Sequence, residues 1–195
     1  MKKHNIINIS LTICFFIIQV LTTVFLIVLK KHDYILEILF VTFVFLIYTY
    51  IEFKYQLYIH NYIKAVTYFS ILCHTLIGEA LDFYVKSYIY DKILHILGTY
   101  AITLFIYALI NQIMHTELNL KYKEFLFIFL LGISLGTFFE IAEFIIDITI
   151  KPKVRAQTNL VDTNLDLIFN ALGSLISALH LKFTNFKLIR KSNES

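Results

Sequence analysis

Residues 124–150 read EFLFIFLLGISLGTFFEIAEFIIDITI, an apolar run that carries three carboxylates, Glu140, Glu143 and Asp147, near its end. A helix of this length rises about 40 Å, and the hydrocarbon core of a bilayer is about 30 Å thick. The run therefore predicts a helix that crosses a membrane. Its carboxylates need a polar environment within the protein, because lipid offers them none.

The rest of the chain has the same character. Of its 195 residues 58% are hydrophobic and 16% are charged, and the mean hydropathy is +0.73. These values are typical of a polytopic membrane protein. We predict an all-α fold, a membrane helical bundle of about six transmembrane helices that forms a single integral membrane domain over residues 1–195. The apolar runs place the helices at about 6–29, 34–51, 61–83, 92–114, 124–150 and 164–181.

Composition also excludes several classes of protein. The first apolar run is too long for a signal peptide and is interpreted as a retained helix. Cys14 and Cys73 both fall inside predicted spans, which argues against a disulfide framework. The net charge of +3 is modest and the basic residues are scattered, so nucleic acid is not an expected partner. Membrane lipids are the expected partners.

The orientation follows from the basic residues. With the amino terminus inside, about ten of the 17 lysines and arginines fall on inner segments, among them Lys2, Lys3, Lys64, Lys187, Arg190 and Lys191. We predict a multi-pass protein of the cell membrane with both termini in the cytoplasm. The loop at 152–163 is then outside.

Polar residues gather on one side of the predicted membrane. The alternation of spans brings together the end of the third helix, the start of the fourth, the end of the fifth and the start of the sixth. These segments carry Glu79 and Asp82, then Asp91 and His95, then Glu140 and Glu143, and finally Asp162, Asp166 and Asn170. We predict that Glu79, His95, Glu140, Glu143 and Asp166 share one polar interior.

The acidic face of the fifth helix is the strongest part of this pattern. Glu140 and Asp147 are about 20° apart around a helix axis, and Glu143 is about 60° from Glu140. A charge near mid-bilayer costs about 2.5–3.5 kcal/mol, so these glutamates are expected to face the bundle interior. A neutral glutamate bonded to a neighbouring helix is the alternative. Gly132 and Gly136 have the spacing of close helix packing.

Several polar residues also have structural explanations. Asp82, Asp91 and Asp162 lie near helix ends, where aspartates cap helices or meet water. His95 is either a satisfied buried histidine or a ligand. His74 precedes Glu79 by five residues and falls on a different helix face, so we interpret it as structural.

The ordered motifs DKILH at 91–95, FFEIAEF at 138–144, VDTNLD at 161–166 and NALG at 170–173 resemble YjdF-type bacterial inner-membrane proteins, and more distantly VanZ-like proteins. The resemblance covers about residues 79–181. It extends to a set that matches the VanZ-like order, namely Asp91, His95, Glu140, Arg155, Asp166, Asn170 and Gly173. Glu143 stands where VanZ-like chains more often have glutamine. The resemblance implies a fold and a residue set, and no reaction.

Three functions are consistent with these residues. The first is a site near the outer face that acts on or binds a lipid or cell-envelope head group, with Glu140, Glu143 and His95 as candidate catalytic residues. Glu140, Glu143, His95 and Asp166 are also candidate ligands of a divalent metal ion. Arg155, Gln157, Asn170 and Asp91 are candidate ligand-binding residues. The second is a proton- or cation-coupled transporter, and the third is a non-catalytic membrane factor that binds an envelope lipid or a protein partner. A lipid or an envelope precursor is the candidate ligand of the site. We favour the first, and leave open whether the protein is an enzyme.

Overall fold

The computed structural model describes residues 6–114, 121–152 and 154–184. These residues form helices and no strand, which confirms the all-α fold class. The helices in chain order are α1 (Ile6–Val28), the 3₁₀ turn η1 (His32–Tyr34), α2 (Ile35–Tyr55), α3 (Asn61–Leu72), the π-helix η2 (Cys73–Ala80), α4 (Phe83–Lys86), α5 (Tyr88–Met114), α6 (Lys121–Thr149) and α7 (Leu160–Phe183).

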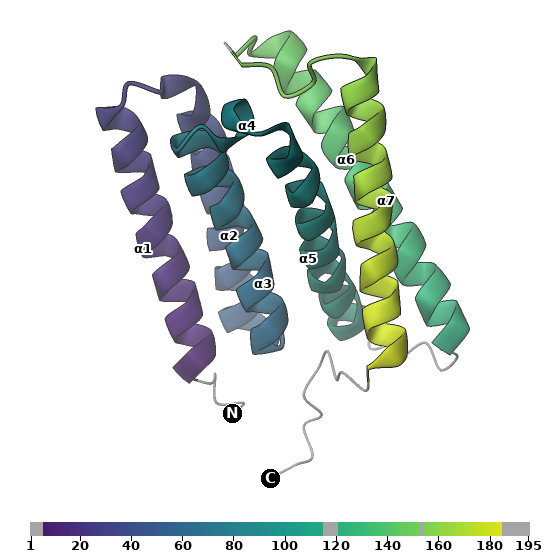
Figure 1. Cartoon of the computed structure of the whole chain (residues 1–195). Helices are drawn as coiled ribbons and strands as arrows, with labels where there is room; N and C mark the ends of the chain where they lie inside the picture. The colour runs from purple at the N-terminus through teal and green to yellow at the C-terminus, as the bar shows by residue number, and fades with distance from the viewer. Residues whose placement is uncertain (1–5, 115–120, 153, 185–195) are drawn as a thin grey trace.

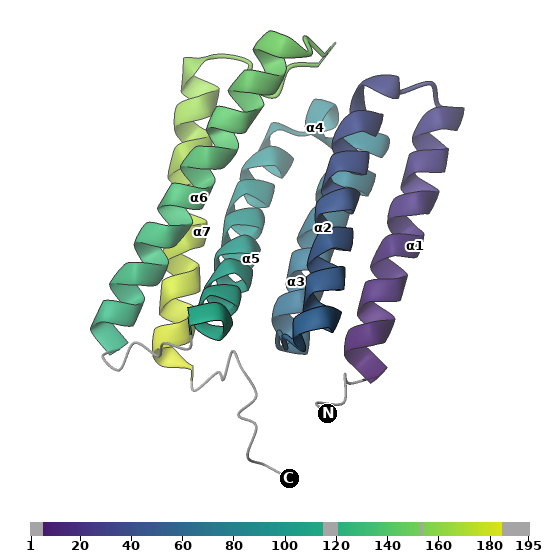
Figure 2. The ribbon, with the colours of Figure 1, turned by 180° about the vertical axis from the view of Figure 1, so that it is seen from behind.

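The long helices run up and down beside one another in two groups (Figures 1 and 2). One half consists of α1, α2 and α3, the other of α5, α6 and α7, and the two halves meet where α3 packs against α5. We call the top of Figure 1, where α1, η2 and α6 finish and α2, α5 and α7 begin, the upper end. Within the described residues, five segments are long and apolar enough to cross a membrane: α1, η1 with α2, α5, α6 and α7.

Aromatic side chains form much of the core. The rings of Phe15 and Tyr68 stack with their centroids 4.3 Å apart, and Tyr48 meets Phe105 edge-on at 4.8 Å. Phe45 lies between these pairs and contacts Tyr68 and Phe105. Large apolar side chains are exposed along the outside of the long helices. A bundle with a packed aromatic interior and an apolar exterior is suited to lipid.

A buried ion pair joins the helices of the first half near the lower end. The Lys64 ammonium lies 2.7 Å from Glu52 Oε2 and donates a hydrogen bond to Asn8 Oδ1 at 2.6 Å. Lys64 is 0% exposed and Glu52 is 1% exposed. Lys64 therefore does not act as one of the loop charges assumed in predicting the orientation. Lys2, Lys3, Lys187, Arg190 and Lys191, which also entered that prediction, lie outside the described residues.

Several helices differ from the predicted ranges: α2 continues to Tyr55 instead of 51, and α7 begins at Leu160 instead of 164. Two further differences bear on the polar residues. The continuous helix expected over 61–83 changes at Cys73 from an α-helix to a π-helix and ends at Ala80, and Asp82 then adopts a left-handed conformation with φ 62°. The helix expected from residue 92 begins at Tyr88 instead. Asp91 and Lys92 are therefore already inside α5, with their side chains directed by helix geometry.

Glycines allow the second half to pack closely. A Cβ added to Gly136 would lie 2.7 Å from the Asn170 Cβ, and one added to Gly132 would collide with Ser174. This confirms the close packing predicted from the Gly132 and Gly136 spacing. A Cβ on Gly173 of α7 would meet the backbone carbonyl of Ile96 in α5. The close approach of α5, α6 and α7 brings their polar side chains within reach of one another at the upper end.

Candidate functional site

His95 lies at the centre of the polar residues of α5, α6 and α7. Its Nε2 atom is 3.3 Å from Asp166 Oδ1 and 3.5 Å from Asp91 Oδ1. Its Nδ1 atom is 3.5 Å from Glu140 Oε1 and 3.2 Å from Asn170 Oδ1. The ring is 7% exposed, so both nitrogens face protein groups from three helices. The structure thus brings together His95, Glu140 and Asp166, as expected from the sequence.

Glu140 is held in place by two amides. Asn170 donates a hydrogen bond from Nδ2 to Glu140 Oε1 at 3.1 Å, and Gln157 donates from Nε2 to Glu140 Oε2 at 3.3 Å. Asn170 is oriented in turn by Thr99, whose hydroxyl donates to its Oδ1 at 2.6 Å. Asp147 accepts the backbone N–H of Gln157 at 2.9 Å, which fixes the loop that carries this residue. Both carboxylate oxygens of Glu140 therefore have fixed directions.

A lysine that the sequence analysis did not select lies among the aspartates. Lys92 Nζ is 2.9 Å from Asp91, 2.6 Å from Asp162 and 2.5 Å from Asp166. Lys92 is 3% exposed. Asp162 also accepts hydrogen bonds from the backbone N–H and hydroxyl of Thr158. The aspartates at the upper end of α5 and α7 thus already have a cation between them, and Asp162 also orders the start of α7.

Among the described residues, no lysine pairs with Glu140 or Glu143. Ligand atoms of His95, Glu140 and Glu143 lie within 4.8 Å of one another, a spacing at which one metal ion could contact all three. Asp91, His95 and Asp166 form a second set at the same spacing and share the histidine. Because the Lys92 ammonium already pairs with both aspartates of the second set, the first is the better candidate for a cation. Glu143 is half-buried and faces the cavity described next.

A cavity of about 440 Å³ lies between the two halves of the bundle. His95, Asp91, Glu143 and Asn170 line it from the second half. Much of the remaining wall is apolar and includes Val41, Phe45, Ile71, Ile102, Leu135 and Phe139. The polar groups come from the upper turns of their helices, so the cavity combines a polar upper part with an apolar wall.

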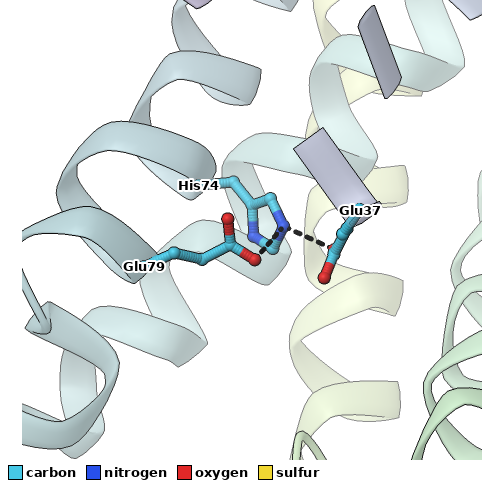
Figure 3. Close-up of side chains that lie close together, drawn as sticks. All are labelled: Glu37, His74 and Glu79. Atoms are coloured by element: carbon cyan, nitrogen blue, oxygen red, sulfur yellow. Dashed lines mark hydrogen bonds and ion pairs between the residues drawn. The ribbon is translucent and has the colours of Figure 1, made fainter. Parts of the chain in front are cut away.

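A second group of polar residues faces the same cavity from the first half. Figure 3 shows the His74 ring between the carboxylates of Glu37 and Glu79. His74 Nε2 is 2.8 Å from Glu37 Oε1 and 3.7 Å from Glu79 Oε1, and Nδ1 is 2.5 Å from the Tyr84 hydroxyl. Burial raises the pKa of the Tyr84 phenol well above its ordinary value, and Asp91 and Glu79 raise it further. Tyr84 therefore keeps its proton.

This arrangement corrects two sequence predictions. Glu79 lies with Glu37 and His74, not with His95, and His74 lies on the same side as Glu79, although we expected the two on different helix faces. In an α-helix residues five apart are about 140° apart around the axis. The π-helix spanning Cys73–Ala80 has i→i+5 turns, which bring His74 and Glu79 to one side. Nothing in the local sequence specified that turn.

Three of the four predicted ligand-binding residues contact the cluster around His95, and one does not. Asp91, Gln157 and Asn170 contact the cluster around His95. Arg155 is exposed on the loop between α6 and α7, and the structure does not bring it to the cluster. Glu37 and Lys92 were missed. Glu37 is a single charge in the first turn of an apolar helix, whereas Lys92 directly follows Asp91 in the second turn of α5. The single charge could have identified Glu37 as a buried partner.

Comparison with known proteins identifies the family. The family described as predicted membrane protein (DUF2238) matches residues 9–185. The chain belongs to this family. An uncharacterized protein from Thermotoga maritima is 41% identical over 108 residues, which are 53% of this chain and 53% of the relative. The chain therefore spans about half the length of the relative it matches. No solved structure was found to match the chain.

Proposed function

We propose that this membrane protein binds the polar head group of a membrane lipid or lipid-linked envelope precursor in the cavity between its two halves, through a divalent cation held by His95, Glu140 and Glu143. The observation that carries the proposal is the cavity itself. One continuous space joins a histidine and carboxylate cluster to an apolar wall. An amphipathic molecule matches both parts.

The chemistry of the cluster supports the cation. Imidazole nitrogen and carboxylate oxygen together suit Zn²⁺ or Mn²⁺. Two glutamates close to each other in a buried site repel when both are ionised, and a divalent ion offsets that repulsion. Asn170 and Gln157 would orient Glu140 as ligand-supporting amides, the role that groups around metal ligands ordinarily play. A metal in this position would leave sites open toward the cavity for a phosphate or carboxylate of the head group.

The wider sequence pattern agrees with this proposal. Four of the residues that resemble YjdF-type and VanZ-like proteins surround the histidine, namely Asp91, Glu140, Asp166 and Asn170. The catalytic roles predicted for Glu140, Glu143 and His95 stay predictions, because binding alone accounts for their geometry. Arg155 is not assigned a role in holding the head group.

The first test measures bound lipid. Ala142 lines the cavity, whereas its neighbour Ile141 is exposed and is not part of the cavity wall. We expect Ala142→Phe to fill the space and remove lipid that co-purifies with the wild-type protein in mild detergent. Ile141→Phe is the matched control and should retain it. Native mass spectrometry of the three proteins measures the difference, and equal lipid content in all of them would contradict the proposal.

The second test measures the metal at this site. Purified protein is equilibrated with Mn²⁺, desalted and analysed by elemental mass spectrometry, as wild type and as Glu140→Gln/Glu143→Gln. We expect the double variant to bind about one Mn²⁺ per chain fewer than the wild type, whereas Asp33→Asn, an exposed acid of η1, binds as much as the wild type. Equal Mn²⁺ content in wild type and double variant would reject the metal. Lipid still bound under those conditions would point to a head group held directly by the side chains.

A further inference from the structure

We propose that Glu37, His74 and Glu79 form a second divalent-metal site, on the opposite side of the cavity from His95. The three residues come from α2 and from the π-helix η2, and their ligand atoms lie within 4.8 Å of one another. This site does not depend on the proposed function, because none of its ligands belongs to the cluster around His95.

One carboxylate oxygen of Glu79 is buried and has no hydrogen-bond partner among the described residues. Glu79 is 3% exposed, and its carboxyl group points toward His74 (Figure 3). No described residue donates a hydrogen bond to its Oε2 atom. A buried carboxylate oxygen without a partner is costly, since it has lost its hydration. A cation bound between Glu79 and Glu37 would supply the missing interaction.

Lys31, a basic residue beside the site, is already paired with another acid. Lys31 donates hydrogen bonds to the backbone carbonyls of Glu79 and Ala80, at 3.4 and 3.0 Å. Its charge is paired with Asp82 at 2.6 Å, so it does not neutralise the Glu79 carboxylate. In the part of the chain that the structure describes, two acids and one histidine therefore face one another without a lysine between them, in contrast to the aspartates around Lys92.

The two ring nitrogens of His74 have the partners expected of a metal-binding histidine. His74 Nδ1 is 2.5 Å from the Tyr84 hydroxyl, which can accept its proton in a hydrogen bond. Metal-binding histidines ordinarily donate one ring N–H to such a partner and coordinate through the other nitrogen. Nε2 faces Glu37 and Glu79. In the absence of metal a proton on Nε2 bridges to Glu37 at 2.8 Å, and metal binding would release that proton.

The π-helix explains how the site is built. His74 and Glu79 share a side only because η2 has i→i+5 turns, and π-turns are rare and frequently occur at functional sites. Glu37 completes the site from the first turn of α2. The ligand set of one imidazole and two carboxylates suits a transition metal such as Zn²⁺, Mn²⁺ or Co²⁺.

The experiment uses Co²⁺ as the probe, because its visible absorption reports histidine coordination. Full-length protein carrying Glu140→Gln/Glu143→Gln serves as the parent, so that the cluster around His95 makes no contribution. We expect the parent to bind about one Co²⁺ per chain with a visible band. Adding Glu79→Gln should weaken binding by more than about tenfold, and adding Tyr84→Phe should weaken it by about 10- to 100-fold.

Asp33→Asn on the same parent is the matched control. Asp33 is an exposed acid four residues before Glu37 and is not part of the cluster, so Co²⁺ binding should be unchanged. Thermal unfolding verifies that each variant is folded, and Glu37→Gln, at a half-buried position, replaces Glu79→Gln if that protein does not fold. A parent that binds no Co²⁺, or equal affinity after loss of Glu79 or Glu37, overturns the second site.

Discussion

Lys92 and Asp166 form an ion pair 2.5 Å long that joins the second turn of α5 to the second turn of α7 inside the bundle. Both residues are buried, at 3% and 1% exposed. The pair gives the aspartate cluster a cation that is part of the chain. Glu140 and Glu143 beside His95 are not among the carboxylates that Lys92 contacts.

Removing that lysine should destabilise the protein strongly. Lys92→Met leaves Asp162 and Asp166 buried without their cation, and breaking a buried ion pair typically costs about 3–5 kcal/mol. Unfolding of the purified protein in detergent by increasing SDS measures the loss. Lys86→Met is the control: Lys86 is exposed and donates only to the Leu81 carbonyl, so its loss should change stability little. Equal stability of the two variants would contradict the structural role of Lys92.

Gly173 should not tolerate a side chain. In Gly173→Ala the new Cβ would lie 3.1 Å from the Ile96 Cα and closer still to its carbonyl oxygen, so α5 and α7 must move apart. Overpacking of this kind costs about 1–3 kcal/mol. Gly98→Ala is the matched change in α5, because its Cβ would meet only the Ser70 hydroxyl at 3.7 Å. It should leave stability unchanged or raise it by up to about 1 kcal/mol through helix propensity. Thermal unfolding of both variants measures the contrast.

Lys64 and Glu52 should show strong energetic coupling. Each of Lys64→Met and Glu52→Gln leaves a charge buried without its partner, at a cost of about 3–5 kcal/mol. The double variant leaves neither charge and should be clearly more stable than the sum of the single effects predicts. A double-mutant cycle from SDS unfolding gives the coupling free energy. If the two single effects are additive, the Lys64–Glu52 ion pair has no coupling free energy.

The predicted orientation can be tested with introduced cysteines. Arg155 lies on the exposed loop at the upper end, and Thr184 follows α7 at the lower end. If both termini are cytoplasmic, a membrane-impermeant maleimide should label Arg155→Cys on intact cells and label Thr184→Cys only after the cells are opened. The opposite pattern would reverse the orientation. Replacing Cys14 and Cys73 by alanine removes background labelling.

The bundle and much of the site around His95 could be predicted because they depend on simple periodicities. Apolar runs of membrane length give the helices, and the α-helical repeat gives the shared faces of Glu140 with Asp147 and of Asp166 with Asn170. Alternation of the spans then places those faces at one end. His95 and Asn170 meet Glu140 in the structure for these reasons.

Other features depend on information that no short window contains. The grouping of His74 with Glu79 requires the π-turn, and an α-helical reading separates the two residues. Lys92 and Lys64 are charges that the sequence places near helix starts, where exposure is the ordinary outcome. Their burial follows from partners on other helices, namely Asp166 on α7 and Glu52 on α2.

The seam between α3 and α5 has a mechanical consequence. The candidate site around His74 belongs to the first half of the bundle and the site around His95 to the second, and the two halves meet along that seam. A molecule that contacts both sites across the cavity would therefore link the two halves and restrict the motion of one half relative to the other. Hydrogen exchange at the upper turns of α2 and α6 should slow when such a molecule binds. If hydrogen exchange there is unchanged when the molecule is bound, the two halves are already rigid relative to each other.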